Sequence, residues 1–368
     1  MKFTCEKSVL QEAGIVASRA VASKSPIAAL EGILFEAGVA LKLTGFDLKE
    51  AIYTSIEADV AEPGSMILNA RFFNELIRRL PDGLVTFTCD EKLNVNVRCG
   101  RSEFSIIGLD TSDYPEMPSF NGTSTFTIPQ NLLKNMISRS IFAVAKDEIR
   151  PVYTGAQFEL QGSELTIVAV DGYRLARRVE HIENKNTENT AFVVPGFALS
   201  DVEKICGDTD EPCYLSIGGK HISFTVGSTV VVTRRLEGDF LNHRKSVPVN
   251  FRTVVGIDRG ELISVIDRVS LVLNDKNNNP VRMTFDDGRI HCVCSASTGK
   301  AEDTCSCDGD GEGIEIGFND RYLLDALKAC EKDELQLCLN TSSSPCVIRA
   351  SDGSESFTYM ILPVRLHA

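Results

Sequence analysis

The chain repeats its own opening, and this internal repeat constrains the fold more than any other feature of the sequence. A short strand-like segment followed by an amphipathic helix pattern occurs at residues 3–10, 126–133 and 255–262. Solenoid repeats have periods of about 20–50 residues, so copies spaced this far apart are typical of duplicated domains. The pattern therefore predicts tandem copies of one domain.

Two further landmarks recur in the same order. The second is a strand pattern that leads into another helix, and the residues at its matching positions are Asn69, Pro195 and Asn319. The third is an end motif with a leucine in each copy: Leu109, Leu236 and Leu362. Three landmarks in three copies predict three homologous domains, over residues 1–122, 123–245 and 246–368, each of a common domain size.

Helical and strand periodicities alternate within each repeat. The apolar positions of the first helix pattern are Val9, Leu10, Ala13, Ala17 and Val21. We expect Asn69 to cap the second helix of the first repeat, and Pro129 to lie in the first turn of a helix. Residues 84–90, 93–100 and 225–236 alternate apolar and polar side chains, as half-buried antiparallel strands do. The predicted fold class is therefore α+β, with two helices packed on antiparallel sheets in each domain.

Composition limits the compartment and the partners. The net charge of −13 argues against a nucleic-acid partner if it is spread evenly, because phosphate binding requires Lys and Arg. No apolar run approaches the ~20 residues that span a bilayer, and the N-terminus lacks the apolar core of a signal peptide. We therefore expect a cytoplasmic protein with no membrane partner, whose 12 cysteines are reduced, buried side chains.

Catalytic and metal chemistry find little support in the motifs. "STGK" at 297–300 lacks the upstream Gly of a phosphate loop, and "DGDGEG" at 308–313 places Asn319 where a calcium loop needs a bidentate carboxylate. Two C-x-C pairs are formed by Cys292, Cys294, Cys305 and Cys307. Buried strand cysteines are the favoured interpretation and a zinc site is the alternative, since structural zinc sites more often use C-x₂-C. We expect no catalytic residue, no cofactor and no metal.

Several motifs resemble those of the bacterial DNA polymerase III beta subunit family, the replicative sliding clamps. They are "MKFTCEKSVL", "LTGFDL", "GRSEFSI", "VAVDGYRLA", "EIGFNDRYLLDAL" and "YMILPVRL", and they follow the family's order along the whole chain. The resemblance implies a DNA clamp with three domains per subunit, paired head to tail as a homodimer into a closed ring around duplex DNA. It implies a non-catalytic processivity factor for the replicative polymerase. The alternatives are a protein scaffold that does not bind DNA and an enzyme with a dispersed active site.

The resemblance also reconciles an acidic chain with a DNA partner, because the helices of this family line the pore. Basic residues gather in or beside the helix patterns, and the candidate DNA-binding residues are Arg19, Lys24, Arg71, Arg78, Arg79, Lys134, Arg139, Lys146, Arg150, Lys204 and Arg268. Phosphate contacts do not depend on base sequence and permit sliding. Lys24 replaces the family's usual Arg, and Gly196 and Phe197 replace a basic pair, so we expect weaker or shifted DNA contacts in the second domain.

Between its second and third domains, the family binds short peptides of the DNA polymerase III catalytic subunit, the clamp loader, other DNA polymerases and repair proteins. The resemblance places this site at Tyr153, Val170, Gly172, Tyr173, Arg174, Leu175, Leu241, Met360, Leu362, Pro363, Val364 and Arg365. The apolar members suit leucine or aromatic anchors, and Arg174 and Arg365 are expected to orient the peptide. Tyr173 and Leu241 replace the commoner His and Pro, so peptide preference is expected to differ.

The resemblance finally places a ring interface between the first domain of one subunit and the third domain of the other. Its apolar residues are Leu76, Leu80 and Phe104 on one side and Val272 and Leu273 on the other. Arg101 is expected to face Glu302 or Asp303. Rim ion pairs contribute only ~0–1 kcal/mol each, so the apolar cluster is expected to supply most of the stability.

Overall fold

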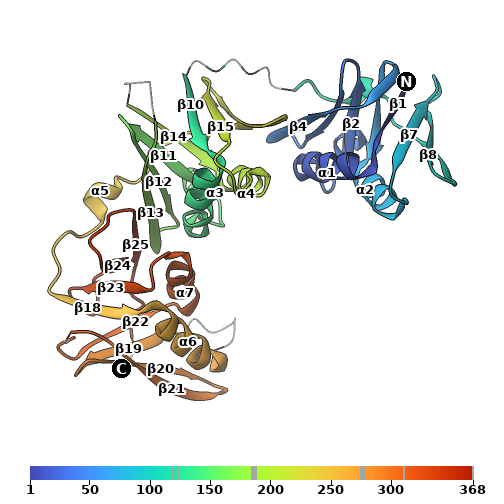
Figure 1. Ribbon diagram of the computed structural model, residues 1–368. Helices are drawn as coiled ribbons and strands as arrows, with labels where there is room; N and C mark the ends of the chain where they lie inside the picture. The colour runs from blue at the N-terminus through green and yellow to red at the C-terminus, as the bar shows by residue number, and fades with distance from the viewer. Residues whose placement is uncertain are drawn as a thin grey trace. The chain divides into compact units, whose positions relative to one another are not determined.

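The computed structural model describes residues 1–117, 120, 122, 124–183, 189–273, 279–309 and 311–366. The chain forms two compact units, one of Met1–Lys134 with Asp201–Arg235 and one of Asn135–Ser200 with Leu236–Ala368. Each unit contains two antiparallel sheets, one of them eight-stranded (Figure 1). We call the two sheets of the first unit A and B, and those of the second unit C and D.

The order of elements repeats three times, as the landmarks predict. The first repeat comprises β1 (Lys2–Glu6), α1 (Lys7–Ala17), β2 (Gly32–Ala37), β3 (Leu41–Phe46), β4 (Glu50–Ile56), β5 (Asp59–Glu62), β6 (Gly64–Asn69), α2 (Ala70–Arg79), β7 (Leu84–Cys89), β8 (Asn94–Cys99) and β9 (Ser102–Ile107). Sheet A has the order β5-β1-β7-β8-β9. The second repeat comprises β10 (Ser124–Pro129), α3 (Gln130–Ser138), β11 (Gly155–Gln161), β12 (Glu164–Val170), β13 (Arg174–His181), β14 (Thr190–Pro195), α4 (Gly196–Ile205), β15 (Pro212–Ile217), β16 (His221–Val226) and β17 (Thr229–Arg234).

The third repeat follows a linker that contains the one-turn helix α5 (His243–Ser246). It comprises β18 (Thr253–Asp258), α6 (Arg259–Val269), β19 (Val281–Asp286), β20 (Arg289–Ala296), β21 (Gly299–Ser306), β22 (Ile314–Phe318), α7 (Asp320–Ala329), β23 (Glu334–Leu339), β24 (Cys346–Ala350) and β25 (Phe357–Ile361). Sheet D has the order β21-β20-β19-β22. The prediction of three α+β repeats, each with two main helices and antiparallel strands, is therefore confirmed.

Side-chain caps fix where the helices begin. The Asn69 side chain accepts a hydrogen bond from Phe72 N at 3.0 Å, and Asn319 caps α7 in the same way, as expected for Asn at this position. Pro129 differs from the prediction because it ends β10, opposite Pro212, and α3 begins one residue later. The first helix also ends earlier than its pattern, at Ala17.

The two eight-stranded sheets join neighbouring repeats. Sheet B has the order β10-β15-β16-β17-β4-β3-β2-β6, so β17 of the second repeat pairs with β4 of the first. Sheet C has the order β14-β11-β12-β13-β25-β24-β23-β18, so β25 of the third repeat pairs with β13 of the second. Each junction therefore uses the last strand of one repeat and the fourth strand of the repeat before it.

The end motif closes each repeat by an isolated backbone bridge. Leu109 pairs with Ile67 and Leu236 with Val193, at equivalent places beside β6 and β14. In the third repeat the equivalent bridge joins Val364 to Gly317. The predicted landmark Leu362 is therefore two residues out of register. Val364 is the residue equivalent to Leu109 and Leu236, because equivalent positions are set by backbone pairing and not by the recurrence of leucine.

Phenylalanines from both halves of the first repeat pack in its core, Phe3 stacked on Phe87 and Phe35 edge to face with Phe73. The ring centroids of Phe3 and Phe87 lie 5.0 Å apart, as do those of Phe35 and Phe73. All four side chains are buried. Two of these rings come from sheet A, one from sheet B and one from α2, so the core holds both sheets and a helix together.

Candidate functional site

An apolar cluster lies on one face of sheet C, where the second and third repeats join. Leu175 on β13 is directly opposite Met360 on β25, and Val170 on β12 is opposite Leu175. Val347 on β24 is opposite Met360 on the other side. These side chains are buried and pack with Tyr153, and the partly buried Leu241 lies against them. Five residues predicted from separate parts of the sequence are thus brought together: Tyr153, Val170, Leu175, Leu241 and Met360.

Apolar residues that the sequence analysis did not identify complete this cluster. They are Val152, Val168, Val193, Cys338 and Val347, with Ala145, Leu236, Phe240, Val247 and Phe251 packed against them. The rings of Phe240 and Tyr153 meet edge to face, with centroids 5.5 Å apart. The alternation in "CVIRA" could have identified Val347, whereas the linker residues carry no periodic signal.

A tight turn presents an aromatic side chain at the edge of the cluster. Asp171 Oδ1 accepts hydrogen bonds from the backbone N–H groups of Tyr173 and Arg174, and Gly172 has a φ of 93° that favours glycine. Tyr173 is 62% exposed and stacks on Tyr322 of α7. Leu362 N donates to Tyr173 O at 2.8 Å, so the C-terminal segment runs beside this turn.

Arg174 has a different role from the one expected. Its side chain is buried, and its guanidinium donates to the carboxylates of Asp171 and Asp325 and to the carbonyl of Phe142. It also lies over the ring of Tyr322 at 4.3 Å. Each nitrogen of the guanidinium group has an acceptor within the chain. Arg174 therefore holds the turn against α7 and has no unpaired nitrogen with which to bind a ligand.

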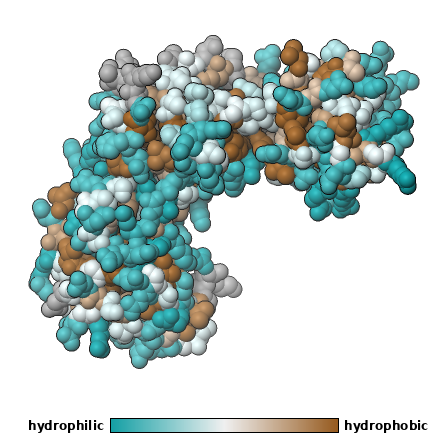
Figure 2. All heavy atoms as spheres, viewed as in Figure 1, coloured by the Kyte–Doolittle hydropathy of each residue, from teal (hydrophilic) through white to brown (hydrophobic). Residues whose placement is uncertain are grey.

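The C-terminal residues of the predicted site lie at the surface. Leu362 and Arg365 are exposed, whereas Pro363 and Val364 are half-buried. Figure 2 shows hydrophilic residues over most of the visible face and hydrophobic residues in small groups among them. Leu362 and Tyr173 therefore offer apolar surface beside a cluster that is otherwise buried.

Six of the eleven candidate DNA-binding residues form ion pairs within the chain. The pairs are Arg19 with Asp201, Arg78 and Arg79 with Glu75, Lys134 with Asp208, Arg139 with Glu331, and Arg268 with Asp303. Arg78 and Arg79 remain exposed in the last turn of α2, and Arg71 is exposed in its first turn. Within the described part of the chain, Lys24, Arg71 and Lys146 form no ion pair, and Arg150 lies over the ring of Tyr153 at 5.6 Å. Lys204 is exposed on α4.

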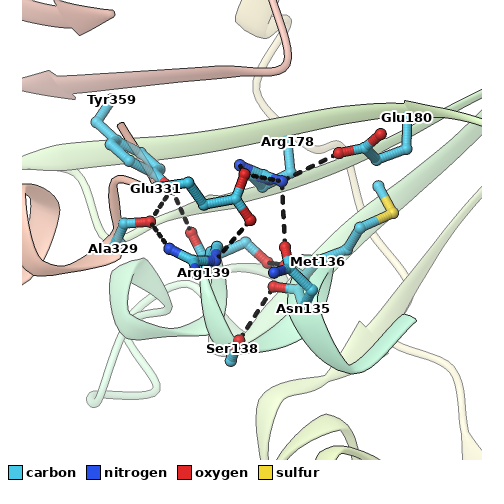
Figure 3. A network of polar contacts seen from close by, with 10 residues as sticks. Asn135, Met136, Ser138, Arg139, Arg178, Glu180, Ala329, Glu331 and Tyr359 are labelled. Atoms are coloured by element: carbon cyan, nitrogen blue, oxygen red, sulfur yellow. Dashed lines mark hydrogen bonds and ion pairs between the residues drawn. The ribbon is translucent and has the colours of Figure 1, made fainter. Parts of the chain in front are cut away.

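Arg139 belongs to a partly buried polar network that links the second and third repeats (Figure 3). Its Nε lies 3.0 Å from Glu331, and its guanidinium donates to the carbonyl of Ala329. Arg178 of β13, which is fully buried, also reaches Glu331, and Tyr359 donates its hydroxyl proton to the Arg139 carbonyl. Burial would raise the pKa of Glu331, but Arg178, a hydrogen bond with Asn135 and Arg139 together outweigh it and hold that pKa below its usual value. Arg139 is thus already ion-paired at the junction between the second and third repeats.

Each sheet in the described part of the chain has two edge strands, and two of these edge strands, β9 and β21, correspond to the strands that join neighbouring repeats. β9 is the last strand of the first repeat and ends sheet A, and β21 is the fourth strand of the third repeat and ends sheet D. At both junctions within the chain, a last strand pairs with a fourth strand in the same way. Exposed strand edges invite pairing with another chain.

Six of the eight predicted interface residues lie on or near these two strands, whereas Leu76 lies in α2 and Leu80 directly follows it. Phe104 on β9 is 39% exposed, and Arg101 precedes that strand. Leu76 and Leu80 are already buried in the core of their own repeat, so they have little surface left for a partner. Ile106 shares the strand face of Phe104 and was not identified from the sequence. The other predicted residues, Val272, Leu273, Glu302 and Asp303, lie on or beside β21.

The remaining motifs form ordinary strand structure. Ser297 and Thr298 make the turn between β20 and β21. Cys292, Cys294 and Cys305 are buried, and burial raises the pKa of Cys294 to about 11 and that of Cys305 to about 12. No group of three or more His, Cys, Asp or Glu that could hold a metal occurs among the described residues, which exclude Asp310 of "DGDGEG". In the described part of the chain, no helix is long and apolar enough to cross a membrane.

Comparisons with known proteins cover the chain from end to end. Family models match in order: DNA polymerase III beta subunit, N-terminal domain, at residues 1–118, central domain at 127–242 and C-terminal domain at 244–365. The beta sliding clamp of Bacillus subtilis is 31% identical over the full length of both chains. A crystal structure of a putative DNA polymerase III beta subunit from Eubacterium rectale has a TM-score of 0.94 at 31% identity, covering 99% of each chain. A Pseudomonas aeruginosa sliding clamp bound to griselimycin has a TM-score of 0.93 at 26% identity, covering both chains fully.

Proposed function

Because the chain belongs to the DNA polymerase III beta subunit family, it is a non-catalytic sliding clamp of DNA replication, and we propose which of its residues perform each part of that work. Clamps of this family form a closed ring of two subunits, bind DNA, and bind the polymerase and other partners through clamp-binding peptides. The observation that supports the proposal most directly is the pair of unused strand edges, which are the edges that a head-to-tail ring would join.

The domain boundaries are proposed at residues 122/123 and 245/246. The first falls between the end of β9 and the start of β10, and the second between β17 and β18. Each domain then contains one full set of strands and two main helices. We place the protein in the cytoplasm, where a bacterial replication factor binds the chromosome.

We infer a register for the junction between subunits from the two junctions within the chain. In the first junction Val231 of β17 is opposite Ile52 of β4, and in the second junction the equivalent pair is Tyr359 of β25 with Ala176 of β13. Following the strand registers through each sheet, the equivalents on the unused edges are Phe104 and Ala301. We therefore place Phe104 directly opposite Ala301 of the partner subunit, where a small residue leaves room for the ring. Ile106, Val272 and Leu273 complete the apolar contact.

This proposed register favours Glu302 over Asp303 as the partner of Arg101. Side chains alternate along a strand, so Arg101 shares a face with Glu103 and lies diagonal to Glu302 of the partner subunit, within reach of long side chains. Asp303 lies on the other face, where it binds Arg268 at 2.6 Å. Glu302 is thus the proposed partner of Arg101.

The DNA-facing residues are proposed to be the exposed basic residues of the helices and the loops beside them. The strongest members are Arg71, Arg78 and Arg79 on α2 and Lys204 on α4, with Lys24, Lys146 and Arg150 on loops. Lys134 and Arg268 carry exposed ion pairs that contribute only ~0–1 kcal/mol and yield readily to phosphate. Arg19 and Arg139 are less suited, because both are held in partly buried pairs.

The partner-peptide site is proposed at the apolar cluster and the segment beside it. Leu175, Leu241 and Met360 would receive apolar anchors, and the exposed Tyr173 and Leu362 would cover them. Arg365 remains the exposed cation that could contact the peptide, whereas Arg174 holds the turn.

A protein scaffold that does not encircle DNA is the competing assignment for this chain. Peptide binding is common to both assignments, so it does not distinguish them. Retention on circular DNA and release after linearisation does, because only a closed ring is held topologically. A chain that binds partner peptides but never becomes trapped on circular DNA would favour the scaffold.

A further inference from the structure

The face of sheet C that bears the apolar cluster continues into a charged row. Side chains at alternate positions share a face, so Arg177 follows Leu175 on β13 and Arg349 follows Val347 on β24. Arg177 is opposite Thr358, and Arg349 is opposite Gln336. Two residues along a strand span about 7 Å, so the charged row lies one side-chain step from the cluster.

A hollow of about 420 Å³ lies along this row. We call it the arginine hollow, and the lining residues used in the argument are Arg177, Val247, Phe251, Val347, Arg349 and Glu355. Val247, Phe251 and Val347 also belong to the apolar cluster or pack against it. The hollow is therefore continuous with the proposed peptide site.

The two guanidinium groups of the hollow lack anionic partners within the described chain. Arg177 is half-buried, and its Nε is buried without a hydrogen-bond acceptor. Arg349 donates from Nε to the neutral side chain of Gln336 at 2.9 Å and lies over the ring of Phe251 at 5.6 Å. A buried donor without an acceptor is unfavourable, so an incoming oxygen atom would be favoured there.

Nearby carboxylates do not form ion pairs with Arg177 or Arg349 in the described residues. Glu159 influences Arg177 electrostatically, but its carboxylate is held by His243 at 3.2 Å and by Arg244 at 3.3 Å. Glu355 lines the hollow and is exposed, and no ion pair joins it to either arginine in the described residues. The hollow thus keeps two positive charges for a ligand.

We propose that the arginine hollow receives the side-chain carboxylate of an Asp or Glu in a partner peptide whose apolar anchor fills the adjacent cluster. The inference rests on the peptide site assigned under the proposed function. An extended peptide advances about 3.3 Å per residue, which places the acidic residue two or three positions from the anchor. Guanidinium–carboxylate hydrogen bonds are short, strong and directional, and they suit a partly buried site.

The test uses the full chain and synthetic peptides acetylated and amidated at their ends. Each peptide carries a Leu-Phe anchor, with Asp or Asn two residues from the anchor on its N-terminal side, or on its C-terminal side in a second pair. Calorimetry should show about tenfold tighter binding of Asp than of Asn in one of the two pairs. A free C-terminal carboxylate on the Asn peptide should not replace the Asp side chain.

Three substitutions separate the possible explanations. Arg177→Gln and Arg349→Gln should each reduce the Asp preference at least threefold and leave the Asn peptide unaffected, whereas Arg349→Lys should retain part of it. Arg289→Gln, an exposed arginine on β20, is the matched control and should change nothing. Thermal melting of each variant shows whether it folds.

The outcomes distinguish this inference from the peptide site itself. Binding of both peptides with equal affinity, or an Asp preference that survives in folded Arg177→Gln, would overturn the arginine hollow and leave the peptide site standing. Failure of any anchored peptide to bind would instead overturn the peptide site. Competition by single-stranded DNA at low salt for the same arginines would assign the hollow to phosphate and also overturn the inference.

Discussion

A buried carboxyl group at the junction of the first two repeats should make that junction sensitive to pH. Glu50 begins β4 directly opposite Thr233 of β17, and it is 2% exposed. Its Oε1 and the Thr233 hydroxyl both lack hydrogen-bond partners. Burial, followed by the negative charges of Asp201 and Asp47, raises the pKa of Glu50 to about 8. The charged groups around it also include Arg19, which pairs with Asp201 at 3.3 Å.

The sign of the effect follows from the raised pKa. The folded chain keeps Glu50 protonated up to about pH 8, whereas the unfolded chain loses this proton near its ordinary pKa of 4.5. The folded state is therefore fully favoured below about pH 4.5 and loses that advantage as the pH rises towards 8. At 1.36 kcal/mol for each tenfold difference in proton affinity, the loss is of the order of 5 kcal/mol.

The substitution Glu50→Gln should remove this dependence, because an amide has no proton to lose. Hydrogen exchange of the β4 and β17 amides, compared between variant and parent at the same pH, measures the local effect. The parent should match the variant near pH 5 and exchange progressively faster than it towards pH 8.5. Glu57→Gln, an exposed carboxyl in the same unit, should behave like the parent. A constant difference between parent and Glu50→Gln across that range would show that ionisation of Glu50 does not control the stability of this junction.

Three further predictions concern the ring, the DNA and the peptide site. Leu273→Asp should give monomers by sedimentation, because closing the ring would bury an unpaired charge; an intact dimer would show that the interface lies elsewhere. Arg71→Glu with Arg78→Glu should weaken DNA association and lower the magnitude of the log–log salt slope by about 0.9 for each lost phosphate contact, whereas Lys220→Glu, in an exposed hairpin turn, should do much less; equal effects would remove the case for DNA-facing helices. Leu362→Ala should weaken binding of anchored peptides at least tenfold without changing dimer mass, since hydrophobic anchors carry most of a peptide's affinity; unchanged calorimetric affinity would contradict the site.

The architecture was accessible from the sequence because each repeat carries its own local signals. The Asn69 cap, the helix periodicity after it and the alternation of β7 and β8 all depend on residues close in the chain. Repetition of these signals made the domain count predictable. Misplacements of one or two residues arose where backbone pairing decides, as at Pro129 and Leu362.

The sequence predicted some of the residues that meet in the apolar cluster, but not their contacts. The strand residues Val170, Leu175 and Met360 meet as expected. The commitment of Arg174 to three acceptors and the burial of Leu76 depend on residues distant in the sequence. Such contacts leave no periodic pattern, so only the three-dimensional structure distinguishes a free arginine from one that holds a turn.

The most direct test of a closed ring around DNA is topological. The protein is loaded onto nicked circular DNA with a clamp loader and ATP, isolated by gel filtration, and the circle is then cut once with a restriction enzyme. A ring that encircles DNA should remain on the circle and leave through the new ends after the cut. Equal retention on circular and linear DNA would contradict encirclement, and with it the assignment of this chain as a ring around DNA.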